Sequence, residues 1–423
     1  MLTVFNWYLR QNIYLKLLPF LFFYITICIL FSGNEFIGDE FRYITFANNL
    51  THGFYSPPPP NFNLWNGPGY PIILVPFVYL KLPYLLFRLL NAFLLYFSLI
   101  ISYKTFYIFS TNKNATIFAI ILGLYYPIYG DALLILTETL SWFLISLTCL
   151  LVIKCFQQNK ISWKLLILTA FTIAYLCMTK IIFGYVIIIM LCLSFGMYFI
   201  KKYQSQAKKV FLLFSIAFMF CLPWLYYTYT ITHKTFYWSN SGSMSLYTMS
   251  SPYENELGDW EIMADSIPNP NRAIFMDSIT KLTPLQRDAA YNEAALKNIK
   301  THPKKYIANW FANVGRLFFS MPFSNKLQST RMYFLLIPNM FIIVTILLIL
   351  GVSLKHYNKY PVAIQLLFIF ISIYLLGCTF VSAYKRMFYI TMPFWFIVIS
   401  FFFKNIVSIK IREPKDANKL LSK

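Results

Sequence analysis

The stretch LLILTAFTIAYLCMTKIIFGYVIIIMLCLSFGMYFI, residues 165–200, contains one charged residue, Lys180, near its middle. An α-helix rises about 1.5 Å per residue, so one helix over this length would be far longer than the hydrocarbon layer of a bilayer, about 30 Å. We therefore predict a hairpin of two membrane-spanning helices, residues 164–179 and 181–200, with Lys180 at or near the turn. Similar apolar segments recur along the chain, so the predicted hairpin indicates an integral membrane protein.

The composition is that of a protein embedded in lipid. Of the 423 residues, 58% are hydrophobic and 12% are charged, whereas a soluble domain has about 25% charged residues. Eight further segments are long and apolar enough, or nearly so, to cross a bilayer: 15–33, 84–103, 115–130, 139–153, 210–231, 332–352, 361–381 and 387–403. We predict an all-α polytopic membrane protein, a helix bundle of about ten or more spans with extracytoplasmic loops and amphipathic juxtamembrane helices.

The distribution of charge predicts the orientation of this bundle. The net charge is +21, but the basic residues form short clusters between apolar segments, which is the pattern of membrane topology and not of nucleic-acid binding. With the N-terminus inside, the cytoplasmic segments are 104–114, 154–164, 201–209, 353–360 and the tail after Phe403, so both termini are cytoplasmic. Thirteen of the 15 carboxylates, all except Glu413 and Asp416, then lie at or beyond the outer face. We expect a multi-pass protein of the cell (inner) membrane whose active site faces the periplasmic or extracytoplasmic side.

Three parts follow from this topology. Residues 1–231 form an N-terminal transmembrane catalytic module with a first outer loop at 33–83, 232–331 form an extracytoplasmic loop, and 332–423 form C-terminal transmembrane helices and a basic cytoplasmic tail. In the first loop, PPPP at 57–60 favours an extended segment, and GPGYP at 67–71 indicates a turn before a short helix or re-entrant piece. In the second loop, apolar residues recur at helical spacing after Pro303, which predicts an amphipathic helix along the outer surface: Ile307, Trp310, Phe311, Val314, Leu317 and Phe318.

Two adjacent carboxylates, Asp39 and Glu40, stand in FIGDEFRYITFANNL, residues 36–50, just after the first span. Neighbouring carboxylates repel each other, which keeps one of them basic or protonated near neutral pH. One of them could then accept a proton from a hydroxyl group. The alternative is a pair at a helix end that is merely solvated by water.

Further charged residues occur near the same predicted face. Asp131 and Glu138 lie between two spans, and an ionisable group that close to lipid is a functional candidate; the alternative for Glu138 is simple pairing with a neighbouring base. Lys180 and Arg386 are the complementary cations. Either alone could be a side chain that snorkels from a helix end to the lipid headgroups, but together they suit a phosphate leaving group.

Motifs for metals and nucleotides do not occur. The four histidines show no zinc-site spacing such as HExxH, and the chain contains neither a Walker loop nor GxGxxG. No cofactor is predicted, and the presence of a divalent metal stays open. Any bound phosphate would have to be held by side chains.

Several short motifs, in their order along the chain, resemble the C-type (GT-C fold) glycosyltransferases that use polyprenyl-phosphate sugars. They are the DE pair followed by Tyr43 and Ala47, GPGYP, LTETL at 136–140, MTKIIFGY at 178–185, LPWLYYTY at 222–229, THPKKY at 301–306 and KRMFYITMPF at 385–394. They are most similar to the branch that holds the lipid A aminoarabinose transferase and the protein O-mannosyltransferases (glycosyltransferase family 39-like), and the match spans most of the chain.

The resemblance implies an integral membrane glycosyltransferase, a hexosyl- or pentosyltransferase of the cell envelope. Its donor would be a sugar on a polyprenyl phosphate such as undecaprenyl phosphate, and its acceptor a hydroxyl or phosphate group of a lipid, glycan or protein. The resemblance also implies the site residues: Asp39 as general base with Glu40 beside it, Glu138 as a second catalytic acid, Lys180 and Arg386 at the donor phosphate, and Tyr43, Asn66, Tyr70 and Asp131 in the substrate cavity.

The chain departs from the family pattern at two places. It has NGPGYP where the motif of the aminoarabinose transferase branch resembles KPPGYW. Asn66 therefore stands in place of a possible phosphate-binding lysine. The final RY of the family is RM here, so only Arg386 corresponds.

Two other classes of function compete with the enzyme. One is a transporter or flippase for lipid-linked sugars, but transporters tend to hold charges near the bilayer midplane and to show related halves with broken helices. Here the ionisable residues gather at one predicted face, and no two halves look alike. The other is a non-catalytic membrane scaffold, or a polysaccharide polymerase or ligase.

Overall fold

The computed structural model describes residues 8, 11–33, 35–158, 160–263, 269–324, 331–353 and 360–406. Most of the predicted cytoplasmic loop 353–360, with Lys355 and Lys359, and the tail that holds Glu413 and Asp416 lie outside the described residues. Within this part of the chain the regular structure consists of α-helices and short 3-10 helices, without strands. The all-α prediction is confirmed.

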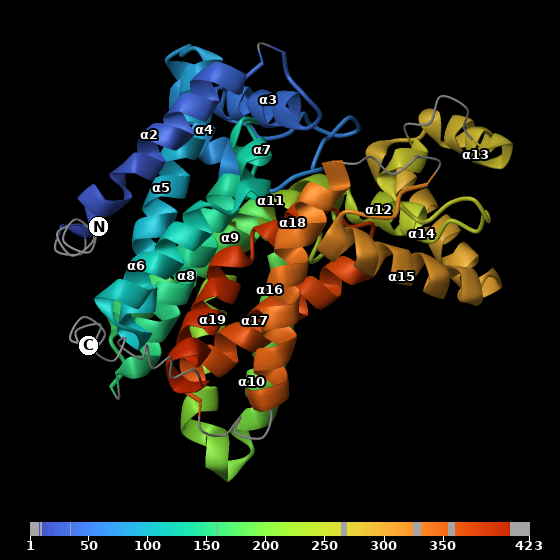
Figure 1. The fold of residues 1–423 in the computed structure, drawn as a ribbon. Helices are drawn as coiled ribbons and strands as arrows, with labels where there is room; N and C mark the ends of the chain where they lie inside the picture. The colour runs from blue at the N-terminus through green and yellow to red at the C-terminus, as the bar shows by residue number, and fades with distance from the viewer. Residues whose placement is uncertain are drawn as a thin grey trace, which may run out of the picture.

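Each of the ten predicted spans is helical over most of its length. The corresponding helices are α2 (Ile13–Phe31), α5 (Tyr84–Phe109), α6 (Asn112–Gly123), α8 (Glu138–Gln157), α9 (Trp163–Thr179), α10 (Ile182–Tyr198), α11 (Gln204–Thr232), α16 (Arg331–Ser353), α17 (Val362–Thr379) and α19 (Met392–Ile406). Figure 1 shows them side by side as one bundle.

Five of the described helices are long and apolar enough to cross a membrane, namely α2, α5, α8, α11 with the turn before it, and α17. A sixth is added when α6 and α7 (Tyr129–Ala132) are taken as one bent span. The hairpin helices α9 and α10 have 17 residues each, or about 25 Å of helix, close to the thickness of the hydrocarbon layer.

Helix α2 shows why the bundle needs lipid around it. Its sequence is almost wholly apolar, yet only 22% of its span is buried inside the protein. Phe22, Leu30 and Phe31 are each more than 60% exposed. In water this apolar face would carry a large hydration cost, whereas in a bilayer it faces acyl chains.

The predicted span 115–130 is not one straight helix. Helix α6 ends at Gly123, and after a 3-10 turn at Tyr126–Ile128 the chain continues as α7, bent by 42° from α6. Pro127 in the turn has no backbone N–H to continue a helical ladder, and the free carbonyl of Gly123 accepts hydrogen bonds from the Tyr24 and Tyr129 hydroxyls at 3.0 and 2.7 Å. The predicted span is therefore a bent pair of helices, and the Tyr24 and Tyr129 hydroxyls satisfy the broken end of α6.

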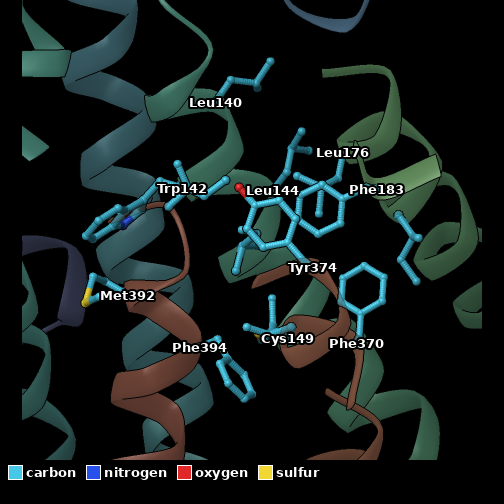
Figure 2. Packing of buried hydrophobic residues seen from close by; sticks show 14 of the residues in the cluster. Leu140, Trp142, Leu144, Cys149, Leu176, Phe183, Phe370, Tyr374, Met392 and Phe394 are labelled. Carbon is cyan, nitrogen blue, oxygen red and sulfur yellow. The ribbon is translucent and has the colours of Figure 1, made fainter. Parts of the chain in front are cut away.

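The hairpin predicted around Lys180 is confirmed. Lys180 follows the last residue of α9, and α10 begins at Ile182. On α10, Phe183 stacks on Tyr374 of α17 with ring centroids 4.3 Å apart and an interplanar angle of 2°. Figure 2 shows these two rings with Phe370 beside them in the middle of the apolar core. This packing ties the hairpin to the C-terminal helices.

The remaining α-helices gather at one end of the bundle, which we call the cavity end. They are α3 (Glu40–Thr51), α4 (Gly69–Tyr79), α7, α12 (Gly242–Met249), α13 (Pro270–Thr280), α14 (Pro284–Thr301), α15 (Pro303–Phe319) and α18 (Lys385–Tyr389). Figure 1 shows α12 to α14 beside the bundle, beyond α18. The opposite end carries the 3-10 turn Lys201–Tyr203 between α10 and α11.

Helix α15 is the amphipathic helix predicted after Pro303, but its buried face is largely polar. Asn309, Asn313 and Arg316 are fully buried beside Leu317, while Ile307 and Phe311 are 55% and 65% exposed. The Asn313 side-chain amide donates to the carbonyl groups of Thr379 and Val381 at 2.9 and 2.7 Å, where the chain leaves α17. The helix thus satisfies the backbone that leads to α18 and turns Ile307 and Phe311 outward.

Candidate functional site

A cavity of about 830 Å³ opens at the cavity end. Parts of the chain that are far apart in sequence contribute to its wall, among them the first loop with α3, the α9–α10 turn, the segment from 236 to 246, the 3-10 turn that holds Trp260, α14, and the segment before and within α18. The charged or polar lining residues from these parts include Asp39, Arg42, Tyr43, Asn66, Lys180, Ser239, Ser241, Ser243, Asp288, Asn292, Tyr384 and Arg386.

Two glycines bring the first loop against the turn that carries Lys180. A Cβ atom on Gly67 would lie 2.1 Å from the carbonyl oxygen of Met178, and one on Gly69 would lie 2.7 Å from the backbone nitrogen of Thr179. Backbones can approach this closely only where no side chain intervenes. The GPG sequence is therefore needed to bring Asp39 and Lys180 into one cavity.

Asp39 lies at the start of α3 with its carboxylate in the cavity. The residue before a helix often caps it with a side-chain hydrogen bond, but the Asp39 side chain makes no such bond. Instead, its Oδ1 lies 3.3 Å from Arg42 Nη1 and its Oδ2 lies 3.2 Å from Arg386 Nη2. About a quarter of the side chain stays exposed, so the carboxylate is accessible to a ligand.

Glu138 lies behind two of the cations. It is buried, and its Oε1 is 2.6 Å from Lys180 Nζ and 3.6 Å from Arg386 Nε. Glu138 does not line the cavity, whereas Lys180 and Arg386 do. This geometry agrees with the simple pairing role that the sequence left open for Glu138, and it holds both cations with their free faces toward the cavity.

The electrostatic environment keeps the site's guanidinium charged and a nearby phenol protonated. Burial lowers the pKa of Arg386, but the carboxylates of Glu138 and Asp39 outweigh this effect, so that the pKa is raised overall. Burial, with the charges of Glu138 and Asp39, raises the pKa of Tyr43. The Tyr43 hydroxyl accepts a hydrogen bond from Asn66 Nδ2 at 3.0 Å, and both residues line the cavity.

Glu40 points away from the cavity into the protein. It is fully buried, and its Oε1 lies 3.4 Å from Arg88 Nη2. Its two oxygens also accept hydrogen bonds from the backbone nitrogens of Ile37 and Ile135, each at 2.7 Å. Asp39 and Glu40 are therefore not a pair of carboxylates that share one site, and Glu40 ties the start of α3 to the segment after α7.

Tyr70 and Asp131 were also predicted to line the cavity, but they lie outside its lining. The Tyr70 side chain is buried and packs edge-on against Tyr43, with ring centroids 5.4 Å apart. Asp131 is partly buried, and its Oδ2 has no hydrogen-bond partner among the described residues. Neither residue lines the cavity. In the described part of the chain, no group of three or more His, Cys, Asp or Glu side chains could hold a metal ion.

Arg42 and Asp288 are cavity residues that the sequence reasoning missed. Arg42 Nη1 donates to Asn66 Oδ1 at 3.2 Å, and its guanidinium lies 5.1 Å from the centre of the Trp65 ring. A signal for Arg42 was present, since it follows Asp39 by three residues at the start of a helix, where such residues share a face. No comparable local pattern marks Asp288.

The comparisons with known proteins include a solved structure. The chain is similar to the structure described as "Crystal Structure of ArnT from Cupriavidus metallidurans bound to Undecaprenyl phosphate", at 11% identity and a TM-score of 0.42, over 93% of this chain and 78% of that chain. ArnT is the lipid A aminoarabinose transferase, a member of the branch that the sequence motifs resemble. No family model and no curated protein sequence matches the chain. At this identity and TM-score the likeness assigns no activity, donor or acceptor to the chain.

Proposed function

We propose that the chain is an integral membrane glycosyltransferase that moves a sugar from a polyprenyl-phosphate donor to a hydroxyl or phosphate group of an acceptor at the extracytoplasmic face. One observation carries the proposal. A partly exposed carboxylate, Asp39, lines the same cavity as Lys180 and Arg386, although the three residues come from distant segments. A base next to cations suits a reaction whose leaving group is a phosphate.

The proposed reaction divides the work between the carboxylate and the cations. Lys180, Arg386 and Arg42 bind the donor phosphate through charge-assisted hydrogen bonds. Asp39 takes the proton of the acceptor hydroxyl, and the acceptor oxygen forms a bond to the anomeric carbon of the sugar. The bond between that carbon and the phosphate oxygen breaks, its electron pair stays on the oxygen, and polyprenyl phosphate leaves, stabilised by the cations.

The ligand-free geometry suggests how the base becomes available. Both Asp39 oxygens lie next to guanidinium groups, Oδ1 by Arg42 and Oδ2 by Arg386. A donor phosphate competes for the same guanidinium groups and frees an Asp39 oxygen to accept a proton. Glu138 stays behind Lys180 and Arg386 and orients them, so we assign it and Glu40 positioning roles.

The location of these charges favours an enzyme over a transporter or flippase. Transporters tend to bind substrate near the bilayer midplane, between related halves. In the described structure, the ion pairs that involve Asp39, Lys180 and Arg386 lie at the turn and loop end of the bundle, next to α3 and α18.

Replacement of the proposed base gives the direct test. Membranes that contain the protein are incubated with a radiolabelled polyprenyl-phosphate sugar, and both the labelled acceptor and the freed lipid phosphate are measured. We expect Asp39→Asn to lower transfer by about 10²–10⁴-fold, the usual contribution of a general base, while the variant still folds into membranes. Asp277→Asn, on the exposed surface of α13, is the matched control. Wild-type turnover by Asp39→Asn would refute Asp39 as the base.

A further inference from the structure

A second part of the cavity wall holds a carboxylate that the proposed chemistry does not use. Asp288 on α14 lines the cavity together with Asn292 from the next turn and Tyr237 from the segment after α11. Only 9% of Asp288 is exposed. None of the described lysine or arginine side chains forms an ion pair with it, although the protein has a net charge of +21.

Among the described residues, the one hydrogen-bond donor to this carboxylate is a phenol. Tyr237 Oη donates to Asp288 Oδ2 at 3.1 Å. Burial and the negative charge of Asp288 raise the pKa of Tyr237, so the phenol keeps its proton as a donor. Asp288 Oδ1 accepts no hydrogen bond from the described residues, and it is not among the oxygens that are shut off from solvent. It is therefore open to hydroxyl or ammonium donors of a ligand in the cavity.

The cavity wall around Asp288 carries short polar side chains, and Trp238, which precedes them, is tightly packed. Ser239, Ser241 and Ser243 add hydroxyl groups in the sequence WSNSGSMS, residues 238–245. Trp238 is held in place on both sides. A Cβ atom on Gly184 of α10 would lie 2.7 Å from its indole ring, and Trp224 Nε1 donates to its carbonyl oxygen at 3.2 Å. Short hydroxyl and amide groups beside an aromatic ring suit a sugar better than an acyl chain.

We propose that Asp288, Asn292 and the serines of 239–243 form an acceptor subsite for a hydroxyl-rich glycan, which favours a neutral or amino-bearing sugar over an anionic one. The inference rests on the proposed function, since the cations at Asp39 are assigned to the donor phosphate. It places the acceptor here because α12 and α14 belong to residues 232–331, outside the bundle, whereas a lipid-linked donor reaches the cations from the bilayer side.

Binding of three sugars that differ in charge tests the subsite without any turnover. Full-length protein in nanodiscs of zwitterionic lipid is titrated with chitosan trimer (cationic), N-acetylchitotriose (neutral) and trigalacturonic acid (anionic). The fluorescence of Trp65, Trp238 and Trp260, which line the cavity, reports binding. We expect the affinity to fall in that order. Since the net charge of +21 opposes non-specific binding of a cation, an anionic trimer that binds as tightly as the cationic one would overturn the proposal.

A variant of Asp288 assigns the charge preference to this carboxylate. We expect Asp288→Asn to weaken binding of chitosan trimer about tenfold and that of N-acetylchitotriose about threefold or less, because a hydrogen bond to a charged group is the stronger one. Glu293→Gln, which makes the same change of charge at an exposed position of α14, should change neither affinity. An equal loss for both trimers, or no loss for either, would contradict the assignment.

Kinetics distinguish an acceptor subsite from one for the sugar of the donor. In Asp288→Asn, we expect the KM for the acceptor to rise while the KM for the donor stays unchanged. A raised donor KM with an unchanged acceptor KM would refute the acceptor role. The titrations need no catalysis. If the trimers show the expected order of affinity but no sugar transfer is detected, the proposed function is refuted while the glycan-binding site is retained.

Discussion

At the scale of single residues, the site separates side chains that are neighbours in sequence. Successive residues of an α-helix point about 100° apart, so Asp39 and Glu40 at the start of α3 reach different surroundings. Asp39 meets two guanidinium groups at the cavity, while Glu40 is buried against Arg88. Their adjacency identified the region from the sequence, but which carboxylate faces the cavity depends on how α3 packs against distant segments.

Arg42 adds a cation to the part of the cavity wall next to Asp39. It lines the cavity beside Asn66, the position where the family pattern has a lysine, and it contacts both Asn66 and Asp39. We propose that it supplies the cation that Asn66 lacks. Arg42→Gln should raise the donor KM by about ten- to a hundredfold, the weight of one hydrogen bond to a charged group. Initial rates over a range of donor concentrations measure this change.

The matched control is Lys300→Gln, which removes a positive charge from the exposed surface of α14. It should leave the donor KM unchanged. If Arg42→Gln behaves like this control, Arg42 serves only to hold Asp39, and the donor phosphate depends on Lys180 and Arg386 alone.

At the scale of elements, the sequence predicted the helices well and their ends less well. Runs of apolar residues predicted the ten helices of the bundle and the Lys180 hairpin, because burial in lipid depends on local composition. The break between α6 and α7 and the largely polar buried face of α15 depend on contacts with residues far away in sequence. In both cases backbone carbonyl groups accept hydrogen bonds from distant side chains, those of Tyr24 and Asn313, and no local pattern shows such a partner.

The close contact between the first loop and the α9–α10 turn depends on Gly67. A side chain at Gly67 would meet the Met178 carbonyl oxygen and the Ile181 side chain, so Gly67→Ala must push the loop away from Lys180. We expect unfolding to become easier by about 1–3 kcal/mol, the usual cost of overpacking, and transfer to fall. Thermal unfolding in detergent and the transfer assay measure the two effects.

Gly196→Ala is the matched control, since no atom lies within 4 Å of a Cβ added there, in α10. Alanine is the better helix former by up to about 1 kcal/mol, so this variant should keep its activity and unfold no more easily. Equal behaviour of the two variants would show that the close approach at Gly67 does not position the site.

At the scale of the whole molecule, charge divides the protein between its two ends. Lysines cluster where α8 leads to α9 and where α10 leads to α11, at the end opposite the cavity. The cavity end holds Asp39, Glu138 and Asp288, with acidic residues of 232–331 around them. Since lysine and arginine in short loops stay in the cytoplasm, this division predicts that the cavity faces outward. The orientation remains a prediction from composition, whereas the cavity forms only where segments distant in sequence meet.

Cysteine labelling measures that orientation. In a background with Cys192, the one exposed cysteine among those described, changed to serine, single cysteines replace Asp277 on α13 and Lys113 at the start of α6, both exposed. A membrane-impermeant maleimide should modify the cysteine of Asp277→Cys in intact spheroplasts and that of Lys113→Cys only after the membrane is permeabilised. The reverse pattern would place the cavity in the cytosol, where a donor presented on the outer leaflet cannot reach Asp39, and the proposed reaction would fail with it.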